Sequence, residues 1–347
     1  MNIYGTAGTD FLYGTAGTDA LVGLGGADYL FGGDGEDLLL GGAGPDVLYG
    51  NSAYVHGTDR DMAFYWDSPT GVMVDLASGH GWYGTAEGDT LIDIEGVRGS
   101  EYNDALFGSA QADDLDGGGG DDLLVGNDGN DDMAGGYGND TLMPGSGADI
   151  VNGGPDNDTV DYLTAGSGVW ASLLFGAGYS GDAAGDSYYW IENLSGTFYS
   201  DYLQGDNADN VLKGYDGDDW LWGEGGDDVL EGGPGADVLT GGDGADTFIW
   251  KDARDTGATI ATADLIWDFD PSVDKIDLRQ IDADNTAGGH QAFEFIGMAD
   301  FTGPGQVRWS IEGSETVVWM NTDGDLTPDA AIRLTGAPLL GDSHVLL

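Results

Sequence analysis

Apolar positions recur along much of the chain with a period of nine residues. The repeating unit reads G-x-x-G-x-D-x-U-x, where U is apolar, and 18 such units fall into three runs. The first position is Gly in 17 units, the sixth is Asp in 17, and the eighth is apolar in all 18, from Leu12 to Phe248. One apolar residue between two outward-facing neighbours is typical of a short β-strand, because alternate side chains of a strand point to opposite faces. The pattern therefore predicts three-residue strands joined by six-residue turns.

The three runs predict an all-β solenoid. Two units make one coil, so equivalent turns stack every 18 residues, at the spacing of about 4.8 Å between neighbouring strands. Glycine lets each turn adopt φ > 0 and direct its carbonyl oxygens toward a point that the position-6 carboxylate also faces. The units begin at Gly5, Gly14, Gly23, Gly32 and Gly41, then at Gly99, Gly108, Gly117, Gly126, Gly135, Pro144 and Gly153, and finally at Gly196, Gly205, Gly214, Gly223, Gly232 and Gly241.

Charge and composition exclude several classes of function. The 347 residues include 9 Lys and Arg against 63 Asp and Glu, for a net charge of −54, so no basic surface for nucleic acid can be assembled. The chain has no cysteine, which excludes a disulfide scaffold and a thiol nucleophile. No window approaches the roughly 18 apolar residues of a membrane span, and the N-terminus MNIYGTAGTD has no Sec-type signal.

The acidic residues point to calcium. Aspartate accounts for 53 of the 63 acids, and short Asp side chains combine with backbone carbonyls in calcium sites. A zinc site is not expected, because cysteine is absent and the four histidines, His56, His80, His290 and His344, are isolated. A cation between two stacked turns would receive oxygens from both of them.

These units resemble the RTX (hemolysin-type) calcium-binding repeat, which winds into a right-handed parallel β-roll. In that family the carbonyls of positions 2 and 4 and the Asp of one turn meet the carbonyls of positions 1 and 3 and the Asp of the turn one coil later. The resemblance implies about eight Ca²⁺ ions, and up to about twelve if turns without Gly at position 4 also bind. The aspartates it assigns are Asp10, Asp19, Asp28, Asp37, Asp46, Asp104, Asp113, Asp122, Asp131, Asp140, Asp149, Asp158, Asp201, Asp219, Asp228, Asp237 and Asp246. The further turn residues it assigns are Gly33, Gly35, Gly118, Gly120, Asn127, Gly129, Gly135, Gly136, Tyr137, Gly138, Gly153, Tyr215, Gly217, Gly226, Gly232, Pro234, Gly241 and Asp243.

Two aromatic-rich spacers separate the runs and match each other at an offset of 97 residues, as Tyr65 matches Tyr162 and Gly88-Asp89 matches Gly185-Asp186. Their alternating pattern predicts short strands in wider coils of the same solenoid. We expect their aromatic side chains mainly to fill and cap these coils. A carbohydrate or partner surface is the alternative, with candidates Trp66, Trp82, Tyr83, Trp170, Tyr179 and Trp190.

The repeats stop near Ala245, and the last hundred residues resemble the serralysin-type C-terminal domain of secreted metalloproteases. The resemblance rests on stretches such as 264–269, 274–278 and 281–283, and it implies a β-sandwich-like cap and type I secretion through an exporter. The expected organisation is an RTX run (1–50), a spacer (51–98), a second run (99–161), a second spacer (162–195), a third run (196–249) and the C-terminal domain with its secretion signal (250–347).

The expected function is that of a secreted calcium-binding protein, extracellular or at the cell surface, which folds on calcium and serves as a structural or adhesive component. It would assemble with itself as a surface layer or matrix, or bind a surface polysaccharide. The chain has no HExxH or GxSxG motif, and with 63 acids a pair of carboxylates carries no information, so we expect no enzyme. The alternatives are the non-catalytic part of a larger secreted hydrolase, and a carbohydrate-binding or carbohydrate-active protein that uses the spacers.

Overall fold

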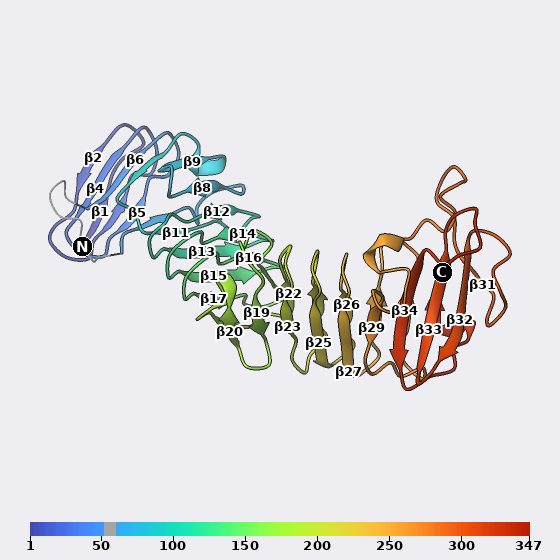
Figure 1. Ribbon diagram of the computed structural model, residues 1–347. Helices are drawn as coiled ribbons and strands as arrows, with labels where there is room; N and C mark the ends of the chain where they lie inside the picture. The colour runs from blue at the N-terminus through green and yellow to red at the C-terminus, as the bar shows by residue number, and fades with distance from the viewer. Residues whose placement is uncertain (52–59) are drawn as a thin grey trace. The chain divides into compact units, whose positions relative to one another are not determined.

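The computed structural model describes residues 1–51 and 60–347 and divides them into two compact units (Figure 1). The first unit contains Met1–Asp161 and Asp182–Ile191, and the second contains Tyr162–Gly181 and Glu192–Leu347. His56 and the other residues of 52–59 lie outside the described part of the chain.

The first unit is a β-roll of two sheets whose strands alternate along the chain. Neighbouring repeat strands are parallel and pair at an offset of 18 residues, as Leu12 pairs with Leu30 and Leu106 with Leu124. One sheet has the order β1 (Asn2–Tyr4), β3 (Ala20–Val22), β5 (Leu38–Leu40), β7 (Met62–Phe64), β11 (Gly96–Arg98), β13 (Asp114–Gly119), β15 (Asp132–Tyr137), β17 (Ile150–Asn152) and β21 (Ser187–Tyr189). The other has the order β2 (Phe11–Tyr13), β4 (Tyr29–Gly33), β6 (Val47–Asn51), β10 (Thr90–Ile92), β9 (His80–Trp82), β8 (Met73–Asp75), β12 (Ala105–Phe107), β14 (Leu123–Val125), β16 (Thr141–Met143) and β18 (Thr159–Asp161).

The second unit continues the same pattern and ends in antiparallel strands (Figure 1). Its first sheet has the order β20 (Ala177–Ser180), β19 (Trp170–Ser172), β23 (Tyr202–Gln204), β25 (Trp220–Gly225), β27 (Val238–Asp243), β29 (Asp264–Ile266), β34 (Ala330–Thr335), β33 (Glu315–Asn321), β32 (Gln306–Glu312) and β31 (Glu294–Phe295). Its second sheet has the order β22 (Asn193–Ser195), β24 (Val211–Lys213), β26 (Val229–Glu231), β28 (Thr247–Ile249), β30 (Lys275–Asp277) and β35 (Val345–Leu346).

The core is the eighth position of each repeat, which confirms the predicted β-roll. Leu21, Leu30, Leu115 and Leu230 are completely buried, and their neighbours in the same strands face outward. Each buried leucine contributes about 1.5–3 kcal/mol through the hydrophobic effect. A chain of short turns therefore acquires a continuous apolar core by stacking.

The spacers are coils of the same roll. Their duplication at an offset of 97 residues is found in the structure as well as in the sequence. In the first spacer Leu91 pairs with Leu48, and Val74 pairs with Leu106, in register with the repeats. Strand β9 forms an antiparallel hairpin with β8, and β20 forms the equivalent hairpin with β19. The bounds of β8, β10, β11 and β12, each shifted by 97, are those of β19, β21, β22 and β23.

The described helices are all short 3-10 turns: η1 (Gly84–Ala86), η2 (Gly181–Ala183), η3 (Ala253–Asp255) and η4 (Asp342–His344). None of the helices in the part of the chain that the structure describes has the length and apolarity that crossing a membrane requires.

Candidate metal centres

A ladder of aspartates links the turns of successive coils. Along the runs, the backbone N–H of one aspartate donates a hydrogen bond to Oδ1 of the aspartate in the next coil, as Asp122 does to Asp140 at 2.8 Å. The distances for Asp28 to Asp46, Asp131 to Asp149, Asp219 to Asp237 and Asp228 to Asp246 are 2.7, 2.8, 2.9 and 2.9 Å. Stacking therefore uses one oxygen of each carboxylate, and the other oxygen faces its own turn.

The ladder extends beyond the repeats to five aspartates that sequence reasoning missed. The backbone amides of repeat aspartates donate to Asp61, Asp89 and Asp186 of the spacers at 2.8, 2.8 and 2.9 Å. In the C-terminal region the acceptors are Asp264 and Asp274, at 2.9 and 3.0 Å. The offset of 97 residues, which relates residue 61 to residue 158 and residue 89 to residue 186, was the sequence signal for the first three.

In one class of turn, the second carboxylate oxygen accepts hydrogen bonds from a residue of its own turn. We call these the closed turns. Oδ2 of Asp19 accepts the backbone N–H of Thr15 at 2.5 Å and its hydroxyl at 2.8 Å. The backbone N–H of Ser or Thr at position 2 donates to Oδ2 in the same way at Asp10, Asp104, Asp113 and Asp201. The hydroxyl joins it on Oδ2 at Asp10 and donates to Oδ1 at the other three. Asn210 stands at position 6 of another such turn, where its side-chain oxygen accepts the N–H of Asp206 at 2.7 Å. The closed turns are thus those of the first two nonapeptide repeats in each run.

In the other class the second oxygen is buried and has no hydrogen-bond donor among the described residues. The residues are Asp28, Asp46, Asp122, Asp131, Asp140, Asp149, Asp219, Asp228, Asp237 and Asp246, none more than 3% exposed. We call these ten the open aspartates. A buried carboxylate oxygen without a partner costs several kcal/mol unless a cation or a proton satisfies it. The geometry of the open turns is therefore that of a cation site.

The glycines of the open turns bring further oxygens to the same place. A methyl group on Gly117 would overlap both Oδ2 of Asp122 and the carbonyl oxygen of Gly135, one coil later, so these two oxygens converge. Gly136 and Gly138 have φ of 112° and 122°, and a side chain on either would overlap the carbonyl oxygen of the equivalent residue one coil earlier. Glycine is required here because the stacked turns approach each other through their carbonyl oxygens.

The carbonyls expected from the resemblance lie in these turns and keep binding capacity. The backbone N–H of Gly120 donates to the carbonyl of Tyr137 at 2.8 Å, and that of Gly217 donates to the carbonyl of Pro234 at 3.0 Å. Each carbonyl oxygen has a second lone pair for a cation. Tyr215 at position 2 has φ of 70°, so a residue other than glycine also fits this position.

Burial raises the pKa of the open aspartates. It raises that of Asp122 and of Asp219 to about 8 and that of Asp131 to about 7, in each case mainly because the carboxylate loses its hydration. Backbone hydrogen bonds from the preceding coil oppose this increase, and the charges of neighbouring aspartates add to it. A divalent cation would reverse the increase, because it stabilises the ionised form.

The donor set fits calcium. In the described residues, no group of three or more His, Cys, Asp or Glu side chains converges on one point. The oxygens that do converge are a carboxylate Oδ2 and a backbone carbonyl of the next coil, as at Asp122 and Gly135, and such oxygens are hard ligands for Ca²⁺ rather than for zinc. In the pair Asp122 and Asp140, the carbonyls of Gly118, Gly120, Gly135 and Tyr137 would complete the set. The ion would neutralise charge and cross-link two coils.

The aromatic candidates of the spacers are distributed over both units. Tyr83, Trp66 and Trp190 are exposed at 64, 50 and 74%, and none of them stacks on a ring from a repeat strand. Trp170 and Tyr179, by contrast, contact each other, with ring centroids 4.7 Å apart and planes tilted by 40°. The structure thus brings two of the six candidates together.

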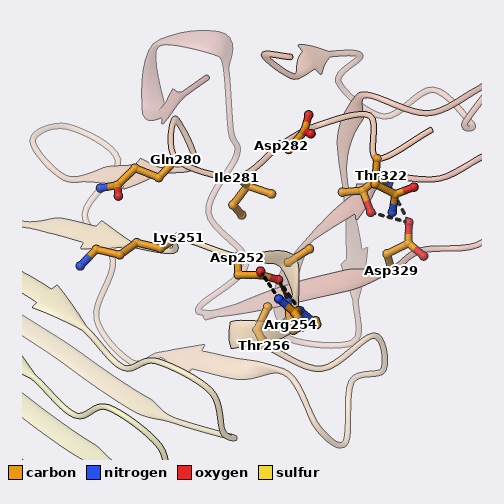
Figure 2. A pocket seen from close by; sticks show the side chains of 11 residues that line it. Lys251, Asp252, Arg254, Thr256, Gln280, Ile281, Asp282, Thr322 and Asp329 are labelled. Carbon is orange, nitrogen blue, oxygen red and sulfur yellow. Dashed lines mark hydrogen bonds and ion pairs between the residues drawn. The ribbon is translucent and has the colours of Figure 1, made fainter. Parts of the chain in front are cut away.

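A cavity in the C-terminal region of the second unit is lined mainly by polar residues (Figure 2): Lys251, Asp252, Ala253, Arg254, Thr256, Gln280, Ile281, Asp282, Asn285, Thr322 and Asp329. Both of its cations are paired with carboxylates, Arg254 with Asp252 at 2.6 Å and Lys251 with Glu231 at 2.6 Å. The hydroxyl of Thr256 donates to a backbone carbonyl at 2.7 Å. The hydroxyl and the backbone N–H of Thr322, a buried residue, both donate to Oδ2 of Asp329, at 3.0 and 2.7 Å, so this carboxylate holds the loop between them.

Comparisons with known proteins agree with this geometry. The sequence pattern described as peptidase M10 serralysin C terminal matches residues 87–346, and that of the RTX calcium-binding nonapeptide repeat (4 copies) matches 4–39 and 31–53. No curated protein matches the chain.

Two solved structures are similar to parts of the chain. The first is a subunit of the mannuronan C5-epimerase of Azotobacter vinelandii, with 28% identity over 43% of this chain and 78% of that one, and a TM-score of 0.32. The second is the extracellular lipase LipA of Serratia marcescens, with 18% identity, a TM-score of 0.26, and coverage of 71% of this chain and 40% of the lipase.

Proposed function

Because the chain belongs to the peptidase M10 serralysin C-terminal family, we propose that it folds outside the cell when calcium binds between its coils, and then serves as an extracellular scaffold or adhesive component. The family and the RTX repeats make the chain a secreted calcium-binding repeat protein. The proposal adds where the ions bind, what they do to the fold and what the folded protein is for.

The observation that carries the proposal is the buried oxygen without a donor on each open aspartate. Five pairs of open aspartates stand one coil apart: Asp28 with Asp46, Asp122 with Asp140, Asp131 with Asp149, Asp219 with Asp237, and Asp228 with Asp246. One Ca²⁺ in each pair would satisfy both members. The closed turns, whose carboxylates already accept N–H or O–H groups, bind no ion in this proposal.

Electrostatics makes the fold depend on these ions. The net charge of −54 opposes a compact chain, and the ladder concentrates carboxylates at the stacked turns. Extracellular calcium modules bind with Kd of about 10⁻⁴–10⁻³ M, which lies above the calcium concentration of a cytosol. The chain would therefore remain unfolded during export through a type I exporter and fold on reaching external calcium.

A structural or adhesive role is favoured over catalysis by the distribution of the chemistry. Repeats, spacers and C-terminal strands together form the described units, and in the cavity of Figure 2 the contact between Thr322 and Asp329 is a loop contact made by a buried threonine. The outer faces of the roll instead carry exposed aromatic side chains, among them Phe11, Trp170 and Tyr202. Such side chains suit contact with a polymer or with another copy.

Equilibrium dialysis of the whole chain against buffered calcium tests the proposal. We expect at least five ions per chain in the millimolar range, with a large decrease in the radius of gyration as they bind. Fewer than five ions, or a chain that is compact before any calcium binds, would contradict it.

A further inference from the structure

We propose that one face of the second unit binds an uncharged polysaccharide. The site lies on the three adjacent strands β19, β23 and β25, and it is lined by Trp170, Tyr202, Gln204, Trp222 and Glu224. Aromatic rings would pack against the sugar rings, and the amide and carboxylate groups would accept and donate hydrogen bonds at the sugar hydroxyls. The proposal goes beyond the calcium-dependent fold and requires only that the second unit be folded.

Strand register places three aromatic rings in one row. Trp170 pairs with Tyr202, and Tyr202 pairs with Trp220, so the three side chains leave the same face of the sheet. Their ring centroids are 6.4 and 5.8 Å apart. The residues that follow them in the three strands are buried in the core: Ala171, Leu203 and Leu221. The row is therefore an outer surface rather than part of the apolar core.

A second row beside the first carries the polar groups. The hydroxyl of Ser172 donates to Oε1 of Gln204 at 2.8 Å, and Nε2 of Gln204 donates to Oε1 of Glu224. The ring of Trp222 lies 6.1 Å from that of Tyr202 and joins the two rows. Apolar ring faces and oriented hydrogen-bonding groups thus stand next to each other, which is the combination that recognises a sugar.

The same chain contains a second row of rings with a different geometry. Tyr13, Phe31 and Tyr49 of the first unit stack face to face, with centroids 4.9 and 4.8 Å apart and planes within 5° and 10° of parallel. In that row each ring covers the face of the next. In the proposed site the planes are tilted by 50° and 34°, and Trp170 and Tyr202 remain 46 and 44% exposed. The rings of the proposed site are therefore splayed rather than stacked in a row, and Tyr179, 4.7 Å from the ring of Trp170, belongs to the same aromatic cluster.

The charges and the length of the site indicate the class of polysaccharide. Its ionisable lining residue is Glu224, and the chain carries −54, so an anionic polymer would be repelled. Two successive centroid separations of about 6 Å make the row longer than one pyranose ring, which favours an oligomer over a monosaccharide. In a β-linked glucan the hydroxyls are equatorial and both ring faces present C–H groups, which pack well on aromatic rings. We therefore assign the site to a neutral β-glucan.

Affinity electrophoresis of the whole chain in millimolar calcium tests the assignment. The native gels would contain laminarin or hydroxyethylcellulose as neutral glucans, and polygalacturonate as an anionic polymer of similar size. We expect at least one of the neutral glucans to retard the wild-type chain. Trp170→Ala should weaken the retardation at least about tenfold. Tyr202→Phe, which keeps the ring, should retain it, and Tyr13→Ala in the face-to-face row should behave as wild type. Circular dichroism of each variant in calcium would show that it is folded.

Several results would overturn the assignment. They are no retardation of the folded wild type by either glucan, equal retardation of folded Trp170→Ala and wild type, and retardation by polygalacturonate alone. Light scattering supplies one more: if the wild type forms dimers that Trp170→Ala abolishes, and neither glucan binds, the face is an interface between two copies.

Discussion

The backbone N–H of Asp122 donates to Oδ1 of Asp140 at 2.8 Å, while Oδ2 of each of these residues is buried without a donor. One carboxylate oxygen thus holds the next coil in register, and the other is left for a ligand from outside the chain. Because the stacking bond and the free oxygen belong to the same side chain, cation binding and coil stacking are coupled. The predictions below follow from that coupling.

Replacing an open aspartate should abolish the binding of one Ca²⁺ ion, whereas replacing the aspartate of a closed turn should not. Asp131→Asn removes a negative charge from the pair with Asp149, and we expect one bound calcium fewer. With calcium at about 100 times Kd, losing one site lowers the free energy of unfolding by about 2.7 kcal/mol. Titration calorimetry gives the stoichiometry, and urea unfolding in calcium gives the stability.

The matched control is Asp113→Asn, one coil earlier. The Oδ2 atom of Asp113 accepts the N–H of Ser109 at 2.5 Å, and Asn210 makes the equivalent bond in its own turn. The control should keep the calcium stoichiometry of the wild type. If both variants lose the same number of ions, the distinction between open and closed turns is wrong.

Glycine at position 4 should matter only where a turn stacks on the previous coil. In Gly138→Ala the new methyl group would overlap the carbonyl of Gly120, at a φ of 122° that suits glycine. We expect a loss of about 1–3 kcal/mol in the free energy of unfolding, or more if the coils must separate. Gly8 occupies position 4 of the first nonapeptide repeat, which begins at Gly5, and no atom lies within 4 Å of its Cβ position. Gly8→Ala should therefore change stability by no more than about 1 kcal/mol. Equal urea midpoints for the two variants would contradict the stacking geometry.

Acid should partly replace calcium. Burial raises the pKa of Asp122 and Asp219 from 3.8 to about 8. A carboxyl group whose pKa is higher in the folded state favours that state most at low pH, and this contribution is lost as the pH rises through the folded pKa. The metal-free chain, prepared with a chelating resin, should therefore gain β-structure between pH 8 and pH 5.

Calcium should show the opposite dependence, because protons compete with it for the same oxygens. The calcium concentration at the folding midpoint should be higher at pH 5 than at pH 8. Circular dichroism at both pH values measures the two effects. A metal-free spectrum that is the same at pH 5 and pH 8 argues against protonation of buried carboxylates.

Export should depend on the C-terminal strands but not on calcium binding. In the folded chain β34 pairs with β29, and Val345 of β35 pairs with Ile276. Deleting the last ~60 residues should leave the protein inside cells that carry a type I exporter. Asp131→Asn should be secreted as the wild type is, because the chain passes the exporter unfolded. Efficient secretion of the truncated chain would show that the signal lies elsewhere.

The repeat made the roll predictable, because one buried apolar residue and one aspartate in every nine residues define both the strand and the turn. The division into open and closed turns was also present in the sequence, as Thr15 or Ser109 at position 2, but it became visible only when the carboxylate and the N–H were placed together. Trp170 was a sequence candidate for a carbohydrate surface, and the 18-residue period places Tyr202 beside Trp220, but the pairing of Trp170 with Tyr202, 32 residues away, could not be predicted. Their adjacency depends on a hairpin in the second spacer, whose length no periodicity specifies.

The central claim, that calcium between the open aspartates holds the roll together, is tested most directly by far-UV circular dichroism of the whole chain at neutral pH. The spectrum would be recorded first with EGTA and then during titration to millimolar calcium. We expect an unfolded spectrum in EGTA and a cooperative change to a β-spectrum as calcium is added. A β-spectrum and a thermal transition that are the same in EGTA and in calcium would contradict it.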